Sequence, residues 1–220
     1  MSNHNLLDAM LSQAKQTKKQ TDKQQKIVET AIKLFAEKGY ANTSTSEISK
    51  AAGVAEGTIF RHFGTKERLL LALILPFLKD FIPTMAGDVF KEIMSKNIVG
   101  FDGFLRALLK NRMEFFKENK DIFQIIVKEL FYKEELRNEF LPYFEENIFQ
   151  RIIQVIDMYK ERGELREDIS TDAVRRLVFT FVGGYFVTHF LLVPDNSSLD
   201  EDDEIENIIK FVMDGIGVKK

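Results

Sequence analysis

The sequence predicts an all-α protein with an N-terminal three-helix domain, built around a helix-turn-helix, followed by a larger helical domain. Three observations predict this fold. Apolar residues recur at helical spacing along most of the chain, no strand-like alternation persists, and glycines stand where short helices would end. Of the 220 residues, 45% are hydrophobic, so the chain can bury a sizeable core. We expect a polar N-terminal arm over residues 1–22, the helix-turn-helix domain over 23–68 and the helical domain over 69–220.

The first two predicted helices have clear start and stop signals. Thr21 or Asp22 caps the first, which carries one apolar face and ends before Gly39. Thr43 is expected to cap the second, and Gly53 ends it. These short helices leave room only for tight turns between them.

The third predicted helix runs from about Ala55 to Phe63, and Gly64 separates it from a longer helix that Thr65 caps. Its other face carries small and polar side chains that suit a groove better than a protein core: Glu56, Gly57, Thr58, Arg61 and His62. Two short helices around a tight turn form a helix-turn-helix, whose second helix can enter the major groove of DNA.

The pattern stays helical after residue 70, with a kink expected at Pro76 and a break at Pro83. Further helices are expected over residues 84–96, 102–118, 120–131, 134–162, 171–192 and 201–217. Seventeen of the twenty Phe residues lie in this part of the chain. Most of them fill the core of a helical bundle, yet rigid rings are hard to pack without gaps, and such gaps make sites for apolar ligands.

The charge is unevenly distributed along the chain. Residues 1–70 hold eleven Lys and Arg against seven Asp and Glu, a net of +4, and the remainder holds twenty against twenty-seven, a net of −7. A basic end on an acidic body fits a DNA-reading head on a soluble body, although chance can also produce it. Four lysines near the start either contact DNA phosphates or belong to a solvated tail: Lys15, Lys18, Lys19 and Lys23.

Several classes of protein are disfavoured. The chain has no Cys, its three His are not at metal-ligand spacing, and it has no phosphate-binding loop or nucleophile elbow. We therefore expect no enzyme, no catalytic residue, no metal and no cofactor. The acidic run from Asp200 to Glu204 is interpreted as a helix start. No segment resembles a signal peptide or a bilayer span, so a cytoplasmic protein without a membrane partner is expected.

Four stretches in sequence order carry a family resemblance. They are LFAEKGY (Leu34–Tyr40), the segment Thr43–Ser49, AAGVAEGTIFRHF (Ala51–Phe63) and the pair Lys66-Glu67. Residues 24–70, about a fifth of the chain, thus resemble the DNA-binding domain of TetR-family transcriptional regulators. The resemblance implies a homodimer that binds a palindromic operator in double-stranded DNA, represses transcription and is released when a small molecule enters its C-terminal domain.

The resemblance also assigns roles by position. It implies that Thr45 meets a phosphate and that Ser46 reaches a base. It implies base-edge contacts from Glu56, Gly57, Thr58 and Arg61, and sugar-phosphate contacts from Phe60, His62 and Lys66. Two positions depart from the family pattern: Phe60 stands where Tyr is usual, and Ala55 stands where a Ser commonly caps the recognition helix.

Elementary chemistry supports several of these roles. Gly57 lets the helix backbone approach the bases, although Gly costs about 1 kcal/mol in a helix interior. Arg61 can make a bidentate contact to guanine worth roughly 1–3 kcal/mol. Lys66 stands at a helix start, where its charge opposes the helix dipole unless a phosphate binds there. Glu56 either accepts a hydrogen bond from cytosine or is a simple first-turn carboxylate.

The predicted helix over 171–192 is apolar on all sides and should be buried between its own subunit and a second one. The resemblance places it with the last helix in a four-helix dimer interface. The candidate contacts are Gly183, Gly184, Ile205, Ile208, Ile209 and Val212. The glycine pair either permits close approach of helices or bends its own helix.

Candidate contacts to the effector are Leu108, Arg112, Phe116, Phe123, Tyr185 and His189. Arg112 either pairs with an acidic ligand head or is a surface or salt-bridged arginine. Tyr185 and His189 either offer polar tips to a ligand or are satisfied by neighbours in the core. The aromatic content favours a lipophilic small molecule. The alternative function is a helical carrier or sensor of apolar ligands without DNA binding, which would not need Gly57, Thr58 and Arg61 on one face.

Overall fold

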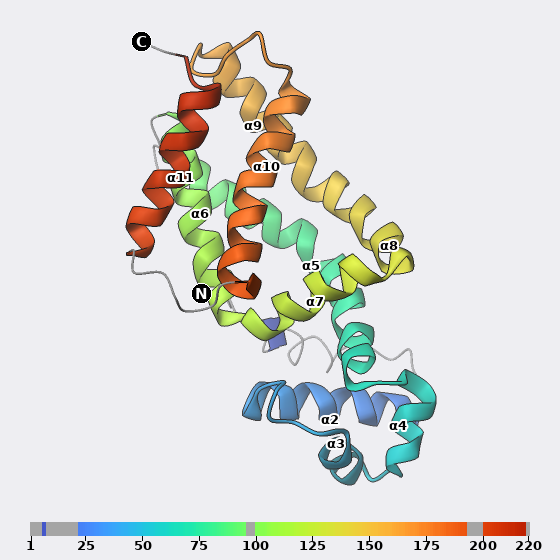
Figure 1. The fold of residues 1–220 in the computed structure, drawn as a ribbon. Helices are drawn as coiled ribbons and strands as arrows, with labels where there is room; N and C mark the ends of the chain where they lie inside the picture. Colours follow the sequence, from blue (N-terminus) through green and yellow to red (C-terminus); the bar gives the residue numbers. More distant parts are fainter. Residues whose placement is uncertain (1–5, 8–21, 96–99, 193–199, 219–220) are drawn as a thin grey trace. The chain divides into compact units, whose positions relative to one another are not determined.

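The computed structural model describes residues 6–7, 22–95, 100–192 and 200–218, and these residues are almost entirely helical (Figure 1). The elements are α2 (Asp22–Lys38), α3 (Thr45–Ala52), α4 (Glu56–Phe63), α5 (Lys66–Ser95), α6 (Phe101–Glu118), α7 (Lys120–Tyr132), α8 (Glu134–Phe144), η1 (Glu145–Phe149), α9 (Gln150–Glu161), α10 (Thr171–Val187), η2 (Thr188–Leu192) and α11 (Glu201–Ile216). Within this part of the chain there is no strand, only an isolated bridge between Leu165 and Gly217. The predicted all-α fold is confirmed.

The chain divides into two compact units. The first comprises Met1–Phe81 and Glu118–Lys128, and the second comprises Ile82–Lys117 and Glu129–Lys220. Helices α2, α3 and α4 lie in the first unit together with the first half of α5. This unit therefore extends beyond residue 68, where the sequence pattern of the helix-turn-helix domain ends.

The short helices of the first unit pack through a few apolar side chains. Helix α3 contacts both α2 and α4. Ile27 and Phe35 from α2, Ile48 from α3 and Ile59 from α4 are each at most 1% exposed. On α2, Ile27, Ala31 and Phe35 are buried at four-residue spacing, so one face of that helix supplies its part of the shared core.

Two residues of the predicted N-terminal arm are part of the first unit. Leu6 and Leu7 are helical and buried, and the backbone N–H of Leu6 donates to Oδ1 of buried Asn119 over 2.8 Å. Residues 1–5 and 8–21 of the arm, which include Lys15, Lys18 and Lys19, lie outside the described residues, and Asp22 begins α2. The apolar start of the chain thus contributes to packing.

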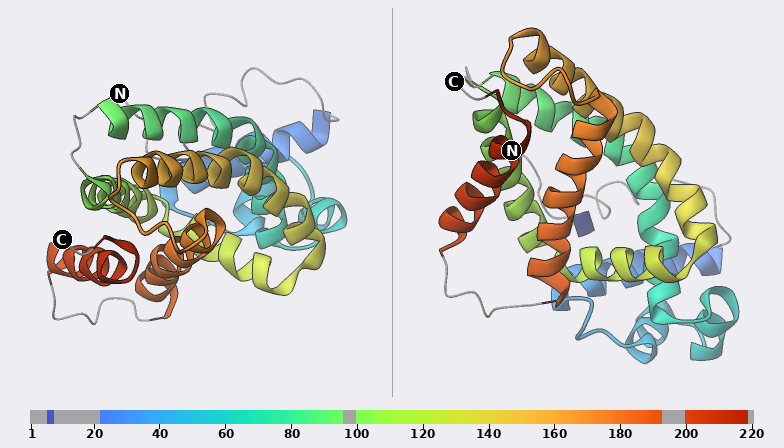
Figure 2. Two further views of the ribbon diagram at one scale, coloured as in Figure 1. Left: turned by 90° about the horizontal axis from the view of Figure 1, so that it is seen from above. Right: turned by 45° about the horizontal axis from the view of Figure 1, so that its top comes forward.

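The second unit has an aromatic core. Phe101 and Phe104 of α6 and Tyr159 of α9 have ring centroids 5.4 to 6.4 Å apart, and all three side chains are at most 2% exposed. Helix α10 packs against both α9 and α11, as the views in Figures 1 and 2 show. Large rings at these positions account for part of the Phe content of the sequence.

Helix α5 runs without interruption for 30 residues, so the break predicted at Pro83 is wrong. A proline inside a helix removes a backbone hydrogen bond and crowds the preceding turn. Here apolar residues on both sides of the prolines are buried, among them Leu70, Ile74 and Ile93, and their packing outweighs that cost. Among the described residues, no helix combines the length and the apolar character needed to cross a bilayer.

Two of the long helices predicted in the second unit contain π-helical segments. The helix predicted over 134–162 consists of α8, the π segment η1 and α9, with Pro142 inside α8. The helix predicted over 171–192 consists of α10 and the π segment η2, and α10 continues through Gly183 and Gly184. Their extents were predicted correctly, whereas the change of helix type was not.

Candidate DNA-binding surface and effector residues

The start of α3 is held by a capping box. The hydroxyl of Ser44 accepts a hydrogen bond from the Glu47 N–H over 3.1 Å, and the Glu47 carboxylate accepts one from the Ser44 N–H over 3.0 Å. This bond from Ser44, together with nearby Lys38, lowers the pKa of Glu47. The prediction that Thr43 caps α3 is wrong by one residue. Thr43 is buried, and its hydroxyl lies 2.9 Å from the carbonyl oxygen of Gly39, so the preceding turn occupies it.

The turn between α3 and α4 depends on a glycine. Gly53 has φ +67°, and it ends α3 as predicted. Ala55 occupies the N-cap of α4 without a side-chain hydrogen bond, so the cap that a Ser would provide is missing. Instead, the Thr45 hydroxyl donates to the Glu56 carboxylate over 2.6 Å and links the starts of the two helices. The DNA contacts of Thr45 and Glu56 stay predictions, and a phosphate contact from the Thr45 hydroxyl would require this bond to rearrange.

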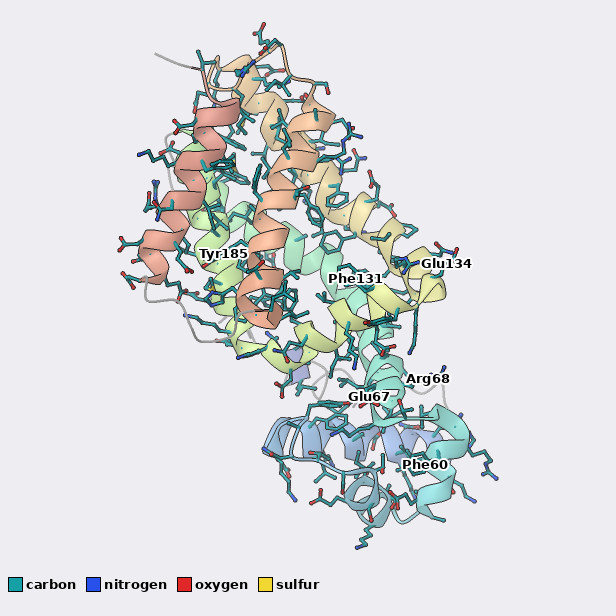
Figure 3. The ribbon with its side chains drawn as sticks, in the orientation of Figure 1. Phe60, Glu67, Arg68, Phe131, Glu134 and Tyr185 are labelled. Carbon is teal, nitrogen blue, oxygen red and sulfur yellow. The ribbon has the colours of Figure 1, made fainter. Side chains whose placement is uncertain are left out.

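Helix α4 has one buried face and one open face. Ile59 is 1% exposed, whereas Phe60, labelled on α4 in Figure 3, is 49% exposed. Gly57 is exposed, and a Cβ added to it would meet no atom within 4 Å. Nothing in this structure therefore requires glycine at position 57. Ser46 and Thr58 are half-buried.

Two basic residues in the last turn of α4 are exposed to solvent. Arg61 is exposed and makes no hydrogen bond or ion pair with the described residues. The adjacent His62 is also exposed, with Nδ1 3.5 Å from Nε2 of Gln24. A guanidinium on an exposed helix, next to a position without a side chain, has the reach and the donors to read a base edge.

Lys66, at the start of α5, is already engaged. Its ammonium donates to the carbonyl oxygens of Tyr40 and Thr43, both over 2.9 Å, and lies 4.1 Å from the centroid of the Tyr40 ring. It thereby joins the start of α5 to the segment between α2 and α3. The predicted phosphate contact of Lys66 stays a prediction, and it would have to share the ammonium with these carbonyls. Thr65 caps α5 as predicted, accepting from the N–H of Arg68 over 3.1 Å (Arg68 is labelled in Figure 3).

The predicted effector residues divide into separate groups. Phe123 belongs to the first compact unit, whereas the other five belong to the second. Phe116 packs on Phe186 and Phe190, with ring centroids 4.9 and 6.2 Å apart. Leu108, Arg112 and Phe116 follow one another at four-residue spacing on α6, so they share a face of that helix.

Tyr185 and His189 converge on one carboxylate of α11. The Tyr185 hydroxyl donates to Oε2 of Glu204 over 3.0 Å, and Nδ1 of His189 lies 3.7 Å from the same oxygen (Tyr185 is labelled in Figure 3). Burial and this bond to Glu204 raise the pKa of the Tyr185 hydroxyl. Of the two interpretations of this pair, the geometry favours polar groups satisfied by a neighbour.

Three of the six predicted dimer-interface residues are buried within the single subunit. Ile205, Ile209 and Val212 are 1%, 3% and 4% exposed, so little of these side chains is left for a partner. Ile208 and Gly183 are half-buried, and Gly184 is exposed. The exposed apolar residues on these two helices are instead Leu177, Phe179, Phe181 and Phe211. The signal for Phe211 was present in the sequence, because it falls outside the buried stripe of isoleucines and valine on α11.

Comparison with known proteins identifies the family of the helix-turn-helix segment. Residues 27–73 match the model of the bacterial regulatory proteins of the tetR family. The helix-turn-helix segment of the chain is thus that of the tetR family of regulators. A relative matching nearly end to end is the HTH-type transcriptional regulator YvkB of Bacillus subtilis, with 24% identity over 87% of this chain and 95% of that protein. The match therefore extends well beyond the helix-turn-helix.

Relatives of higher identity match over shorter segments. The fatty acid metabolism regulator protein of Bacillus subtilis is 35% identical over 36% of this chain and 41% of that protein. The regulator YerO of the same organism is 30% identical over 49% of this chain and 36% of its own length. The chain thus spans less than half the length of each of these two relatives.

Solved structures of the family share the fold. The TetR-family repressor FadR of Thermus thermophilus, solved in complex with lauroyl-CoA, superimposes with a TM-score of 0.58 at 24% identity. The superposition covers 90% of this chain and 96% of that one. The helical fold of this chain therefore recurs in a known regulator.

Proposed function

We propose that the protein represses transcription as a homodimer on a palindromic operator and is released by a lipophilic small molecule. The observation that carries this proposal is the open face of α4. Gly57 leaves the helix backbone uncovered, and Arg61 stands exposed without a partner among the described residues. A face that is open in the free protein and carries a suitable donor is available to a DNA groove.

The contacts that hold α4 in place are consistent with DNA binding by its open face. Its inner side is anchored by Ile59, and its start is joined to α3 by the bond between Thr45 and Glu56. Since the Glu56 carboxylate already accepts this hydrogen bond, we assign Glu56 to positioning α4. Sequence reading then falls chiefly to Arg61 and to the close backbone approach at Gly57.

The exposed apolar residues of α10 and α11 support a homodimer. Phe181 and Phe211, 39% and 61% exposed, stand edge to face with centroids 5.0 Å apart, and Leu177 and Phe179 are each 43% exposed on α10. Exposed aromatic side chains in contact on two neighbouring helices are typical of an interface. A two-fold axis would bring the same patch of two subunits together and present two copies of α4 to the two half-sites of an operator.

The apolar interior and the relatives support a lipophilic effector. The cluster of Phe116, Phe186 and Phe190 lies on α6, α10 and η2, and a FadR structure of the same fold holds lauroyl-CoA. A Bacillus subtilis relative is a fatty acid metabolism regulator. We therefore expect a molecule with a long apolar part to favour the form released from DNA.

The test is Arg61→Ala, measured by gel shift on the DNA that flanks the gene, at constant ionic strength. We expect operator affinity to fall by about tenfold to a hundredfold, because a bidentate base contact is worth roughly 1–3 kcal/mol. Affinity for unrelated DNA should change much less. Size-exclusion chromatography with light scattering should show an unchanged dimer.

The matched control is Arg166→Ala, which removes the same charge from the second unit, where Arg166 pairs with Asp168 over 2.5 Å. This variant should bind the operator like the parent protein. If Arg61→Ala keeps full discrimination between operator and unrelated DNA, Arg61 does not read sequence. If the parent protein itself shows no preference for the flanking DNA, the carrier or sensor function without DNA binding takes its place.

A further inference from the structure

Arg112 of α6 is a half-buried guanidinium that makes no ion pair or hydrogen bond with a carboxylate among the described residues. Its Nε and Nη2 donate to Oδ1 of the adjacent Asn111 over 3.1 and 2.5 Å, and its Cζ lies 4.8 Å from the centroid of the Phe115 ring. Burial lowers the pKa of Arg112 to about 10, and the negative charge of Glu92 offsets this only in part. The arginine is therefore desolvated, while its hydrogen-bond acceptor is a neutral amide.

Arg106, on the same helix, shows the ordinary arrangement. It donates two hydrogen bonds to the Glu206 carboxylate, over 2.5 and 2.8 Å, and also lies 3.7 Å from Asp102. The sequence left open whether Arg112 forms a salt bridge. In the structure Arg106 on the same helix forms one. Asn111 occupies two of the five N–H donors of Arg112, which leaves donors on Nη1 and Nη2 for a further acceptor.

Apolar side chains lie one turn before and one turn after Arg112 on the same face of α6. One turn further along α6, Phe116 packs on Phe186 and Phe190. One turn earlier, Leu108 lies on the same face of the helix. A positive head group next to aromatic and aliphatic side chains matches the two ends of an amphiphile whose head is an anion.

The other polar group of the predicted effector residues does not suit an anion. Tyr185 and His189 both face the carboxylate of Glu204, whose negative charge would repel a second anion. Among the predicted effector residues, the polar end of the ligand is therefore better matched to Arg112.

We propose that Arg112 is the counter-ion for an oxyanion at the head of the lipophilic effector, with the apolar part of that molecule against the aromatic cluster of Phe116, Phe186 and Phe190. The inference rests on the proposed function, which supplies the lipophilic effector. The oxyanion is either the carboxylate of a free acid or a phosphate of an acyl thioester carrier, and the same guanidinium would bind both by paired hydrogen bonds.

The experiment uses the full-length protein and matched ligands. Binding of octanoate, dodecanoate, hexadecanoate and lauroyl-CoA is measured by titration calorimetry, beside the alcohols of the same three chain lengths. The same molecules are tested for release of the protein from its operator DNA. We expect at least one anion to bind at least about tenfold more tightly than its uncharged counterpart, since hydrogen bonds to charged groups have this strength.

Three variants assign the effect to the residue. Arg112→Met should weaken binding of the anion at least about tenfold and leave the alcohols unchanged. Arg112→Lys should recover part of the lost anion affinity, because lysine keeps the positive charge but cannot donate the paired hydrogen bonds of a guanidinium. Arg106→Met, the control on the same helix, should leave anion binding unchanged. Thermal unfolding should show that Arg112→Met folds at least as stably as the parent, since it removes a half-buried charge that forms no ion pair with the described residues.

The outcomes separate this inference from the function on which it rests. Loss of acid binding in Arg112→Met identifies a carboxylate head, and loss confined to lauroyl-CoA identifies a phosphate. If alcohols bind and release the operator as well as acids do, or if Arg112→Met binds anions like the parent, the oxyanion inference is overturned and the lipophilic effector stands. If no molecule of the series binds or releases the operator, the lipophilic effector fails, and this inference fails with it.

Discussion

The helix-turn-helix and the second compact unit are stabilised over different distances along the chain. In the helix-turn-helix, Ser44 and Glu47 cap α3 from three residues apart, and Gly53 ends it in the left-handed conformation. In the second unit, Arg106 pairs with Glu206 and Lys117 pairs with Glu201, contacts that span 100 and 84 residues. Short-range signals can be read from a sequence window, whereas these ion pairs exist only after α6 and α11 meet.

The same contrast between short-range and long-range contacts separates the candidate DNA-binding face from the predicted effector residues. The contacts that hold α4 in place mostly join residues close together in the chain. A short sequence motif is therefore enough to identify its open face. The arrangement of the predicted effector residues in the second unit depends on which of its helices come together. Only the structure shows that Arg106 pairs with a carboxylate, whereas Arg112 makes no such ion pair with the described residues. Four substitutions test this division, beginning with the largest expected effect.

Phe104→Ala should remove about 3–5 kcal/mol from the free energy of unfolding, because Phe104 is 2% exposed and its loss leaves a cavity. Urea denaturation followed by circular dichroism measures the change. The control is Phe131→Ala, where the side chain is 71% exposed and the cost should be well under 1 kcal/mol. Similar losses for the two variants would contradict the aromatic core described for the second unit.

Ser44→Ala should cost about 1 kcal/mol of unfolding free energy, the usual value of an N-cap, because it leaves the Glu47 N–H without its acceptor. The measurement is again urea denaturation. Ser46→Ala, two residues further along the same helix, removes a hydroxyl with no hydrogen bond among the described residues and should be nearly neutral. A loss for Ser46→Ala that equals the loss for Ser44→Ala would sink the capping assignment.

Gly57→Ala should stabilise the free protein by up to about 1 kcal/mol, because alanine favours helix and the added Cβ meets no atom within 4 Å. The same variant should bind operator DNA more weakly. Gly53→Ala is the contrasting control, since its φ of +67° should make the alanine variant less stable by about 1 kcal/mol. Operator affinity that is unchanged in Gly57→Ala would show that α4 does not approach DNA at this position.

Glu206→Gln should have the smallest effect at neutral pH, under about 1 kcal/mol, because its ion pair with Arg106 is exposed. The hydrogen bond from Arg106 lowers the pKa of Glu206 below its unfolded value of 4.5. The stabilisation is therefore complete above that value and is lost as the pH falls through the folded pKa. Thermal unfolding between neutral and acidic pH should show a shallower decline for Glu206→Gln than for the parent.

The control for this last prediction is Glu167→Gln, an exposed carboxylate without an ion pair among the described residues. Its acid decline should match that of the parent protein. Equal slopes for Glu206→Gln and the parent would mean that the pairing between α6 and α11 does not contribute in solution. High salt should reduce the difference between the variants, because exposed pairs are screened.

The sequence by itself determined the helical fold, the ends of the short helices and the likeness of the helix-turn-helix to the tetR family, because these depend on residues close together in the chain. Gly53 and Gly64 were located from the pattern, and the capping residue of α3 was missed by one position since two hydroxyls stand side by side. The tertiary structure alone decided that α5 continues past Pro83 and that Ile205 and Ile209 are buried within the subunit. It also decided that Arg106 forms an ion pair with a carboxylate, whereas Arg112 forms none within the part of the chain that the structure describes. Such outcomes depend on packing between helices distant in sequence, which no local pattern encodes.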